Sequence, residues 1–237
     1  MTKKKSKFPI YLRIFEIPSE TANMQQPINL SNLSAIIFDL GGVILNLDYN
    51  LTINAFKELG GAKFDELYTQ ANQSRIIDKY ETGQISTRDF LDYMQSFLPG
   101  NTKDEAITNA WNAMLLNLPA ERIDFLYQIK QKLPIFLFSN TNELHFQNFT
   151  GYIEKTFGNK GLLEDIFNQT YYSHIEGLRK PDALAFEKVI KDHKLDPATT
   201  LFIDDSIQHI EGARKVGLLT KHLIDEDIID IFDGLKT

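Results

Sequence analysis

The chain has 237 residues, of which 43% are hydrophobic and 24% charged, proportions typical of soluble globular proteins. Its net charge of −7 argues against a nucleic-acid partner, since phosphate backbones select clustered Lys and Arg, but it allows a small phosphorylated substrate. Cysteine is absent, which excludes disulfides and thiolate–metal sites and fits a reducing, cytoplasmic location. No run of about 18 apolar residues predicts a membrane-spanning helix.

Residues 1–32 are expected to form a loosely attached N-terminal extension. Lysines followed by a partly apolar run give it a faint likeness to a secretory signal peptide, but Arg13, Glu16 and two prolines interrupt the run. Met24 is an alternative start, because the sequence from that residue leads directly into the first strand, expected at 33–39. That strand is short, apolar and partly β-branched, and it ends on Asp39.

Helical patterns without strand signals fill the region from about 51 to 118, with breaks at 60–61, 83 and 99–100. In the segment 86–98, Ser86 suits a helix N-cap, and an apolar stripe follows at helical spacing. That stripe comprises Phe90, Tyr93, Met94 and Phe97. In the segment 102–116, a similar stripe comprises Ala106, Ala110, Trp111, Met114 and Leu115. Such stripes predict a small helical bundle rather than a cofactor site.

After Pro119, segments with strand and helix patterns alternate. Helices are expected at 120–133, 182–194 and 206–217, and strands at 134–140, 169–174, 200–205 and near 219–223, with a polar segment at 141–149. Alternation of this kind predicts an α/β fold with a parallel, Rossmann-like sheet. We expect the core to comprise residues 33–48 and 119–237, with a helical-bundle cap inserted at 49–118.

Polar groups follow three of the predicted strands, where a doubly wound sheet binds its ligands. The first strand ends on Asp39, the second on Ser139 and Asn140, and the strand at 200–205 on Asp204 and Asp205. Lys180 precedes Pro181 at a helix start between the third and fourth strands, and Gly41 and Gly42 follow Asp39 closely. Each feature alone is typical of a turn or a helix cap, but the combination favours a shared site.

This combination suits phosphoryl transfer through a covalent intermediate. A carboxylate can act as the nucleophile, and neighbouring carboxylates bind Mg²⁺ together with substrate phosphate oxygens. A lysine, a hydroxyl and backbone N–H groups would stabilise the charge of the transferring group. The glycines allow the backbone to pass close to a phosphate.

Four motifs, "FDLGGV", "FSNTN", "RKPD" and "FIDDS", resemble in this order those of the haloacid dehalogenase-like hydrolase superfamily. The resemblance covers roughly residues 33–223. The details "YETGQIS" and "IEGA" are similar to the branch containing α-D-glucose-1-phosphate phosphatase and the N-terminal phosphatase domain of soluble epoxide hydrolase. The resemblance implies that Asp39 is the nucleophile and that Lys180 stabilises charge. It further implies that Ser139, Asn140 and Gly42 bind phosphate. It also implies Mg²⁺ ligation by Asp39, the Gly41 carbonyl and Asp205, with Asp204 acting through water or by orienting Lys180.

Two positions depart from the family pattern. Gly41 stands where many family phosphatases carry a second aspartate, which acts as the general acid and base. Its absence predicts a steep dependence on leaving-group basicity, unless another group supplies the proton. His209 stands where asparagine is expected, and it is interpreted as a structural variant.

Specificity is expected to come from the cap and the segment after the glycines, with Asp48, Tyr49, Tyr80 and Glu81 as substrate-facing candidates. The sequence therefore favours a Mg²⁺-dependent phosphatase for a small phosphorylated metabolite, with a sugar phosphate as one candidate. Two alternatives stay open: a 2-haloacid dehalogenase using the same Asp39, and a degenerate member that serves as a binding protein. The oligomeric state is not predicted.

Overall fold

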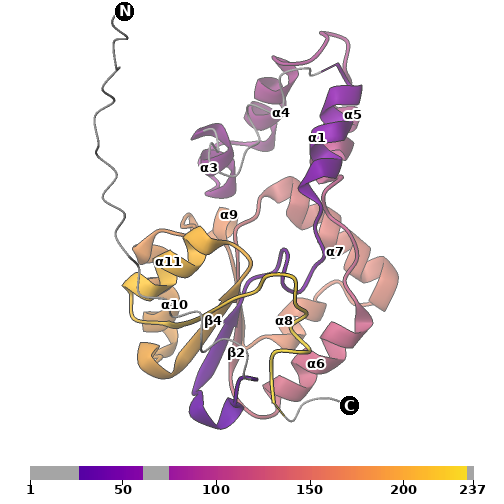
Figure 1. Cartoon of the computed structure of the whole chain (residues 1–237). Helices are drawn as coiled ribbons and strands as arrows, with labels where there is room; N and C mark the ends of the chain where they lie inside the picture. Colours follow the sequence, from indigo (N-terminus) through magenta and orange to yellow (C-terminus); the bar gives the residue numbers. More distant parts are fainter. Residues whose placement is uncertain (1–26, 61–74, 234–237) are drawn as a thin grey trace, which may run out of the picture.

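The computed structural model describes residues 27–60 and 75–233 (Figure 1). Met24 and residues 1–26 of the expected extension lie outside this range. Five parallel strands form one sheet in the order β3-β2-β1-β4-β5, which confirms the predicted α/β fold class. The strands are β1 (Ala35–Phe38), β2 (Ile135–Ser139), β3 (Gln169–Tyr172), β4 (Thr200–Asp204) and β5 (Leu219–His222).

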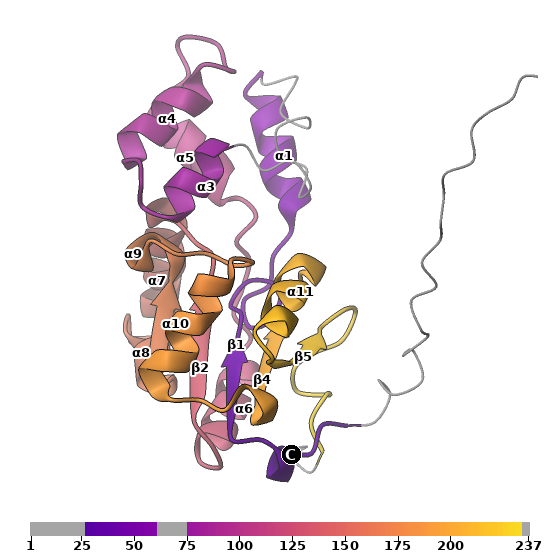
Figure 2. The same cartoon turned by 90° about the vertical axis from the view of Figure 1, so that its left-hand side faces the viewer.

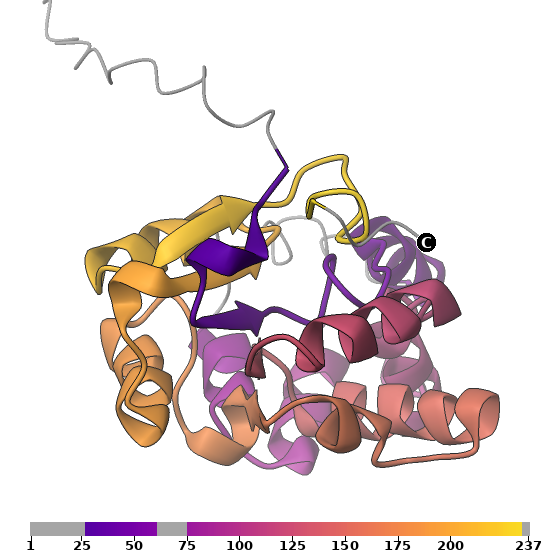
Figure 3. The same ribbon diagram turned by 90° about the horizontal axis from the view of Figure 1, so that it is seen from below.

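Helices cover both faces of this sheet, and the view from below separates the two groups (Figure 3). One face packs on α6 (Ala120–Lys130), α7 (Glu143–Phe157) and α8 (Leu162–Ile166). The other packs on α10 (Ala183–His193) and α11 (Ile207–Lys215), while the short α9 (Ser173–Glu176) follows β3. Alternate residues of β1 point to opposite faces of the sheet, since Ile36 packs with the first group of helices and Ile37 with the second. Burial on both faces explains why the strands read as continuous apolar runs.

The helices between β1 and α6 gather at one end of the molecule (Figure 2). They are α1 (Tyr49–Glu58), α3 (Arg75–Glu81), α4 (Thr87–Gln95) and α5 (Asp104–Asn112). Their buried side chains form an apolar cluster that also includes Leu144 of α7, and within it Phe90 lies against Tyr80 and Trp111. We propose that this unit is the expected cap, with boundaries at 49 and 118.

Local sequence explains how these helices begin and end. Ser86 caps α4 as predicted, because its hydroxyl and the Asp89 carboxylate satisfy each other's backbone N–H groups. The predicted stripe on α4 is correct for Phe90 and Met94, which are buried, but Phe97 lies beyond the helix end and is exposed.

Two other segments differ from expectation. The polar segment 141–149 begins the 15-residue α7, whose N-cap is Asn142. Ile28, expected in a loosely attached extension, pairs with Phe232, and its N–H donates to the Ile231 carbonyl over 2.7 Å. Ile28 also packs against the core, which accounts for its attachment.

Candidate active site

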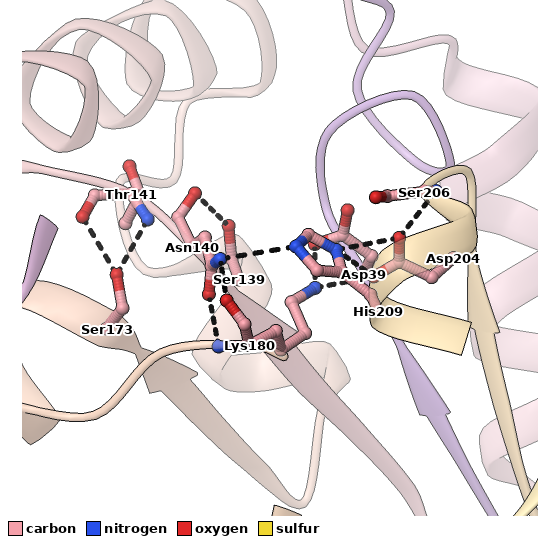
Figure 4. Close-up of polar contacts among 9 residues, drawn as sticks. All are labelled: Asp39, Ser139, Asn140, Thr141, Ser173, Lys180, Asp204, Ser206 and His209. Carbon is pink, nitrogen blue, oxygen red and sulfur yellow. Dashed lines mark hydrogen bonds and ion pairs between the residues drawn. The ribbon is translucent and has the colours of Figure 1, made fainter. Parts of the chain in front are cut away.

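The carboxyl ends of three parallel strands bring the predicted polar groups to one edge of the sheet (Figure 4). Asp39 follows β1, Ser139 ends β2 and Asp204 ends β4, and all three are buried. The order of the strands places β1 between β2 and β4, so Asp39 is central. This is the shared site that the strand-end rule predicts.

Lys180 connects two of the buried carboxylates, those of Asp39 and Asp204. Its fully buried Nζ donates to Asp39 Oδ1 and to Asp204 Oδ2, each over 2.7 Å. The rings of Phe138 and Phe202 lie beneath the ammonium, with each centroid 5.3 Å from Nζ. Burial alone would lower the pKa of Lys180, but the two carboxylates outweigh it and hold that pKa above its ordinary value. The side chain is therefore a fixed positive charge.

The backbone of Lys180 is also anchored. Its N–H donates to Asn140 Oδ1 and its carbonyl accepts from Asn140 Nδ2, both over 2.9 Å. The Lys180–Pro181 bond is cis, and Gly212 of α11 packs directly against Pro181, where a Cβ would collide with the carbonyl oxygen. Asn140 therefore positions the lysine, and it also lines the cavity of the site.

Asp204 is occupied by protein partners. Its Oδ1 accepts from the Ser206 N–H over 2.8 Å, and the Nδ1–H of His209 lies 2.9 Å from the same oxygen. Burial opposes ionisation, but Lys180 and His209 outweigh it and hold the pKa of Asp204 below its ordinary value. This arrangement favours the orienting role that the resemblance implied for Asp204. It also gives His209 a structural partner, in line with the interpretation from sequence.

Asp39, Asp204 and Asp205 form a cluster whose ligand oxygens lie within 4.8 Å of one another. Burial raises the pKa of Asp39, and burial followed by the charge of Asp39 raises the pKa of Asp205 to about 7. Three carboxylates face the single charge of Lys180, so the cluster carries an excess of negative charge. Hard oxygen donors with this excess fit a divalent cation such as Mg²⁺, which would keep the carboxylates ionised.

Gly42 brings the loop after β1 against Asp205. Its φ of 73° lies in the left-handed region, and a Cβ at this position would collide with the Asp205 carboxylate. The second glycine of "FDLGGV" is therefore required by the close approach of the cation-site carboxylate.

A cavity of about 480 Å³ opens above these groups. Asp39, Gly41, Ser139, Asn140 and Asp205 line it, together with Tyr49 and Glu81 from the cap. Lys180 and Asp204 are fully buried and lie behind this lining. Gly42, predicted to bind phosphate, is not part of the lining, and its N–H donates to the Leu45 carbonyl over 2.8 Å, so that prediction is corrected.

Two of the specificity candidates lie elsewhere in the described chain. Asp48 is the N-cap of α1, where its side chain accepts from the Asn50 N–H. The Tyr80 ring stacks on Phe90, and its hydroxyl accepts from the Leu144 N–H over 3.2 Å. Both predictions are corrected: these side chains build the cap instead of facing a substrate.

Two cavity residues were missed in the sequence analysis. Arg179, next to Lys180, reaches across to the cap and pairs with Glu81 through Nη2 over 2.9 Å. His145 stacks on Trp111 beneath the cap, with ring centroids 5.0 Å apart. The sequence signal for Arg179 was its place directly before Lys180 in the motif "RKPD".

Among the described residues, none of the helices combines the length and the apolarity that a membrane span requires.

Comparisons with known proteins found relatives of similar sequence and fold. The chain is 27% identical over 186 residues to a D-ribitol-5-phosphate phosphatase of Bacteroides thetaiotaomicron, covering 78% of this chain and 89% of the relative. It is 26% identical to a sesquiterpene phosphatase of Aspergillus oryzae, covering 82% and 92%. A crystal structure of a haloacid dehalogenase family enzyme from Bacteroides thetaiotaomicron, in complex with magnesium and inorganic phosphate, superposes with a TM-score of 0.75. That enzyme is 30% identical, with 83% of this chain and 96% of the other covered.

The sequence profile of the haloacid dehalogenase-like hydrolases matches residues 33–217, which span all four motifs and the inserted helices. This match and the shared fold confirm the resemblance at the level of the family, and with it the expectation of a hydrolase. The chain belongs to the haloacid dehalogenase-like hydrolase family.

Proposed function

We propose that the protein is a Mg²⁺-dependent phosphatase, which hydrolyses a small phosphate ester through a phosphoryl intermediate on Asp39. The observation that carries the proposal is the cluster of Asp39, Asp204 and Asp205 with Lys180 bound between two of its members. A buried nucleophile beside a fixed ammonium and a cation site is suited to an incoming dianionic phosphate.

Each residue has a defined part in the reaction. Asp39 attacks phosphorus and becomes an acyl phosphate, and water then releases phosphate and regenerates the carboxylate. Lys180, together with the Ser139 hydroxyl and the backbone N–H of Asn140, stabilises the transferring group. Asp39, the Gly41 carbonyl and Asp205 would hold Mg²⁺, which supplies positive charge for the phosphate oxygens.

The size of the cavity supports a small substrate. A volume of about 480 Å³ falls within the range of metabolite sites, roughly 300–1,000 Å³. The similarity to a D-ribitol-5-phosphate phosphatase makes alditol and sugar phosphates the first esters to assay. The cap would close over the bound ester and exclude water from the acyl phosphate.

A 2-haloacid dehalogenase is the alternative within this family. Attack of Asp39 on carbon needs no metal, so it gives no reason for a cluster of three carboxylates. The cluster therefore favours phosphoryl transfer.

The test is turnover of p-nitrophenyl phosphate and a panel of sugar and alditol phosphates, with Mg²⁺ and with excess EDTA. We expect hydrolysis that requires Mg²⁺ and is lost in Asp39→Asn. Chloride release from 2-haloacids would instead support the dehalogenase, and failure of both reactions would support a binding protein. Activity that persists in EDTA would contradict the metal assignment.

A further inference from the structure

Gly41 leaves the proposed phosphatase without the general acid at the second position after the nucleophile. The alcohol that leaves the phosphate must nevertheless take up a proton, and the donor has to lie in the same cavity. Among the residues that the structure describes, five other side chains lining the cavity carry a titratable group: Tyr49, Glu81, His145, His209 and His222.

Four of them are poorly matched to this transfer, because of their pKa or because a ring N–H is already donated to a protein oxygen. Burial lowers the pKa of His145 to about 4, and its Nε2 faces the Trp111 carbonyl over 3.1 Å. Burial, reinforced by nearby carboxylates, raises the pKa of Tyr49 above its ordinary value. His209 gives its Nδ1–H to Asp204, and His222 directs Nε2 at the Asp205 carbonyl over 2.9 Å. Glu81 is the group that remains.

Glu81 ends α3 and lines the same cavity as Asp39 and Asp205. Its side chain is only 14% exposed, and it pairs with the guanidinium of Arg179, which is 13% exposed. Arg179 directly precedes Lys180, so this pair lies beside the phosphate site. The negative charges of Asp205, Asp39 and Glu81 all contribute to the raised pKa of Tyr49, at the start of α1. Carboxylates of the core and of the cap therefore act on the same phenol.

Arg179 is shared by two carboxylates. Asp78, one turn before Glu81 on α3, also pairs with it through Nη1. One guanidinium cannot neutralise both, and Asp78 is 41% exposed, so water supports its charge. The uncompensated charge therefore falls on the buried Glu81. Burial raises the pKa of Glu81 to about 7, against the opposing effect of Arg179 and, more weakly, Lys180. That pKa suits a group that gives up and regains a proton at neutral pH.

We propose that Glu81 is the general acid and base of the reaction, delivered to the site by the cap in place of the residue missing at position 41. This inference rests on the proposed phosphatase function. In the first step, Asp39 forms a bond to phosphorus while the ester P–O bond breaks, and the Glu81 carboxylic acid protonates the departing alkoxide. In the second step, the Glu81 carboxylate takes a proton from the attacking water, and the P–O bond to Asp39 breaks. Glu81 is thereby reprotonated, and the cycle closes.

The test compares Glu81→Gln with the wild-type full-length chain on two esters in the presence of Mg²⁺. The readout is kcat/KM, which covers only the steps up to departure of the alcohol. For ethyl phosphate, whose alkoxide is a poor leaving group, we expect a loss of about 10²–10³-fold. For p-nitrophenyl phosphate, whose phenolate needs no proton, we expect a change of less than about threefold. Equal losses on both esters, or no loss on ethyl phosphate, would overturn the proposal.

Asp78→Asn provides a second variant that keeps Glu81 in place. Removing the charge of Asp78 leaves Arg179 to Glu81 and lowers the pKa of that carboxyl. The decline of kcat/KM for ethyl phosphate at alkaline pH should therefore move to lower pH, by about one unit. An unmoved profile would contradict the proposal, even if Glu81→Gln did not fold. Absence of wild-type turnover of both esters would overturn the phosphatase function itself, which separates the two failures.

Discussion

Substitution of Lys180 by Met removes the charge that joins the two most buried carboxylates while retaining the length of the side chain. Nζ donates to Asp39 and Asp204 over 2.7 Å, and Lys180 and Asp204 are both fully buried. Removing one partner of a buried ion pair leaves the other charge uncompensated, at a cost of about 3–5 kcal/mol. We therefore expect the free energy of unfolding of Lys180→Met to fall by about that amount at neutral pH.

Urea denaturation followed by circular dichroism measures this loss, and Lys188→Met is the matched control. Lys188 also joins two carboxylates, Asp192 over 2.9 Å and Glu176 over 3.5 Å, but on the solvent side of α10. Exposed ion pairs contribute little, so this control should unfold at the same urea concentration as the wild type.

Two further measurements separate electrostatics from packing. The loss in Lys180→Met should shrink as the pH falls, because Asp39 and Asp204 can then take up protons in place of the lost ammonium. Saturating Mg²⁺ should also recover part of the stability, because a cation compensates the same carboxylates. A loss below about 1 kcal/mol, or one that does not change with pH and Mg²⁺, would refute the reasoning.

Two other predictions concern residues around the site. His145 is buried with a pKa of about 4, so the unfolded chain binds more protons below pH 6.5. Stability should fall by about 3 kcal/mol as the pH drops from 6.5 to 4, and His145→Gln should flatten this dependence in urea denaturation; an unchanged slope would contradict the assignment. Gly42→Ala should raise the Mg²⁺ concentration needed for half-maximal activity, because its Cβ displaces Asp205. Gly158→Ala is the control: it has the same φ of 73° with open space around it, so equal Mg²⁺ requirements in both variants would contradict the collision.

The network around His145 explains its sensitivity to acid. Because a carbonyl only accepts, Nε2 must carry the proton that reaches the Trp111 oxygen. Nδ1 then accepts from Asn142 Nδ2, whose orientation is fixed because Oδ1 accepts from the Trp111 ring and the His145 N–H. A second proton on the ring would sit on Nδ1, where it would face the N–H of Asn142 Nδ2, so two donors would oppose each other.

The fold and the centre of the site were predictable from the sequence because both follow from local pattern. Strands that alternate with helices predict a parallel sheet, and a parallel sheet places Asp39, Ser139 and Asp205 at one edge. Lys180 was predictable only as part of the combination, since a lysine before a proline carries no signal of its own. The closer likeness to the α-D-glucose-1-phosphate phosphatase branch stays a prediction.

The parts that failed depend on tertiary context. The segment 141–149 reads as polar, yet it begins α7 because Asn142 caps the helix and His145 is buried against Trp111. Tyr80 and Glu81 are neighbours in sequence, but successive residues of a helix point about 100° apart. One therefore faces Phe90 and the other faces the cavity, and only the position of α3 decides which.

The most direct test of the central claim is to trap the phosphoryl group on Asp39. The enzyme is mixed with excess phosphate ester and Mg²⁺, quenched rapidly, and reduced with borohydride, which converts an aspartyl phosphate into homoserine. Peptide mass spectrometry should then find homoserine at position 39, and none when Mg²⁺ is withheld. Rapid alcohol release with an unmodified position 39, or with the modification on another carboxylate, would contradict Asp39 as the nucleophile.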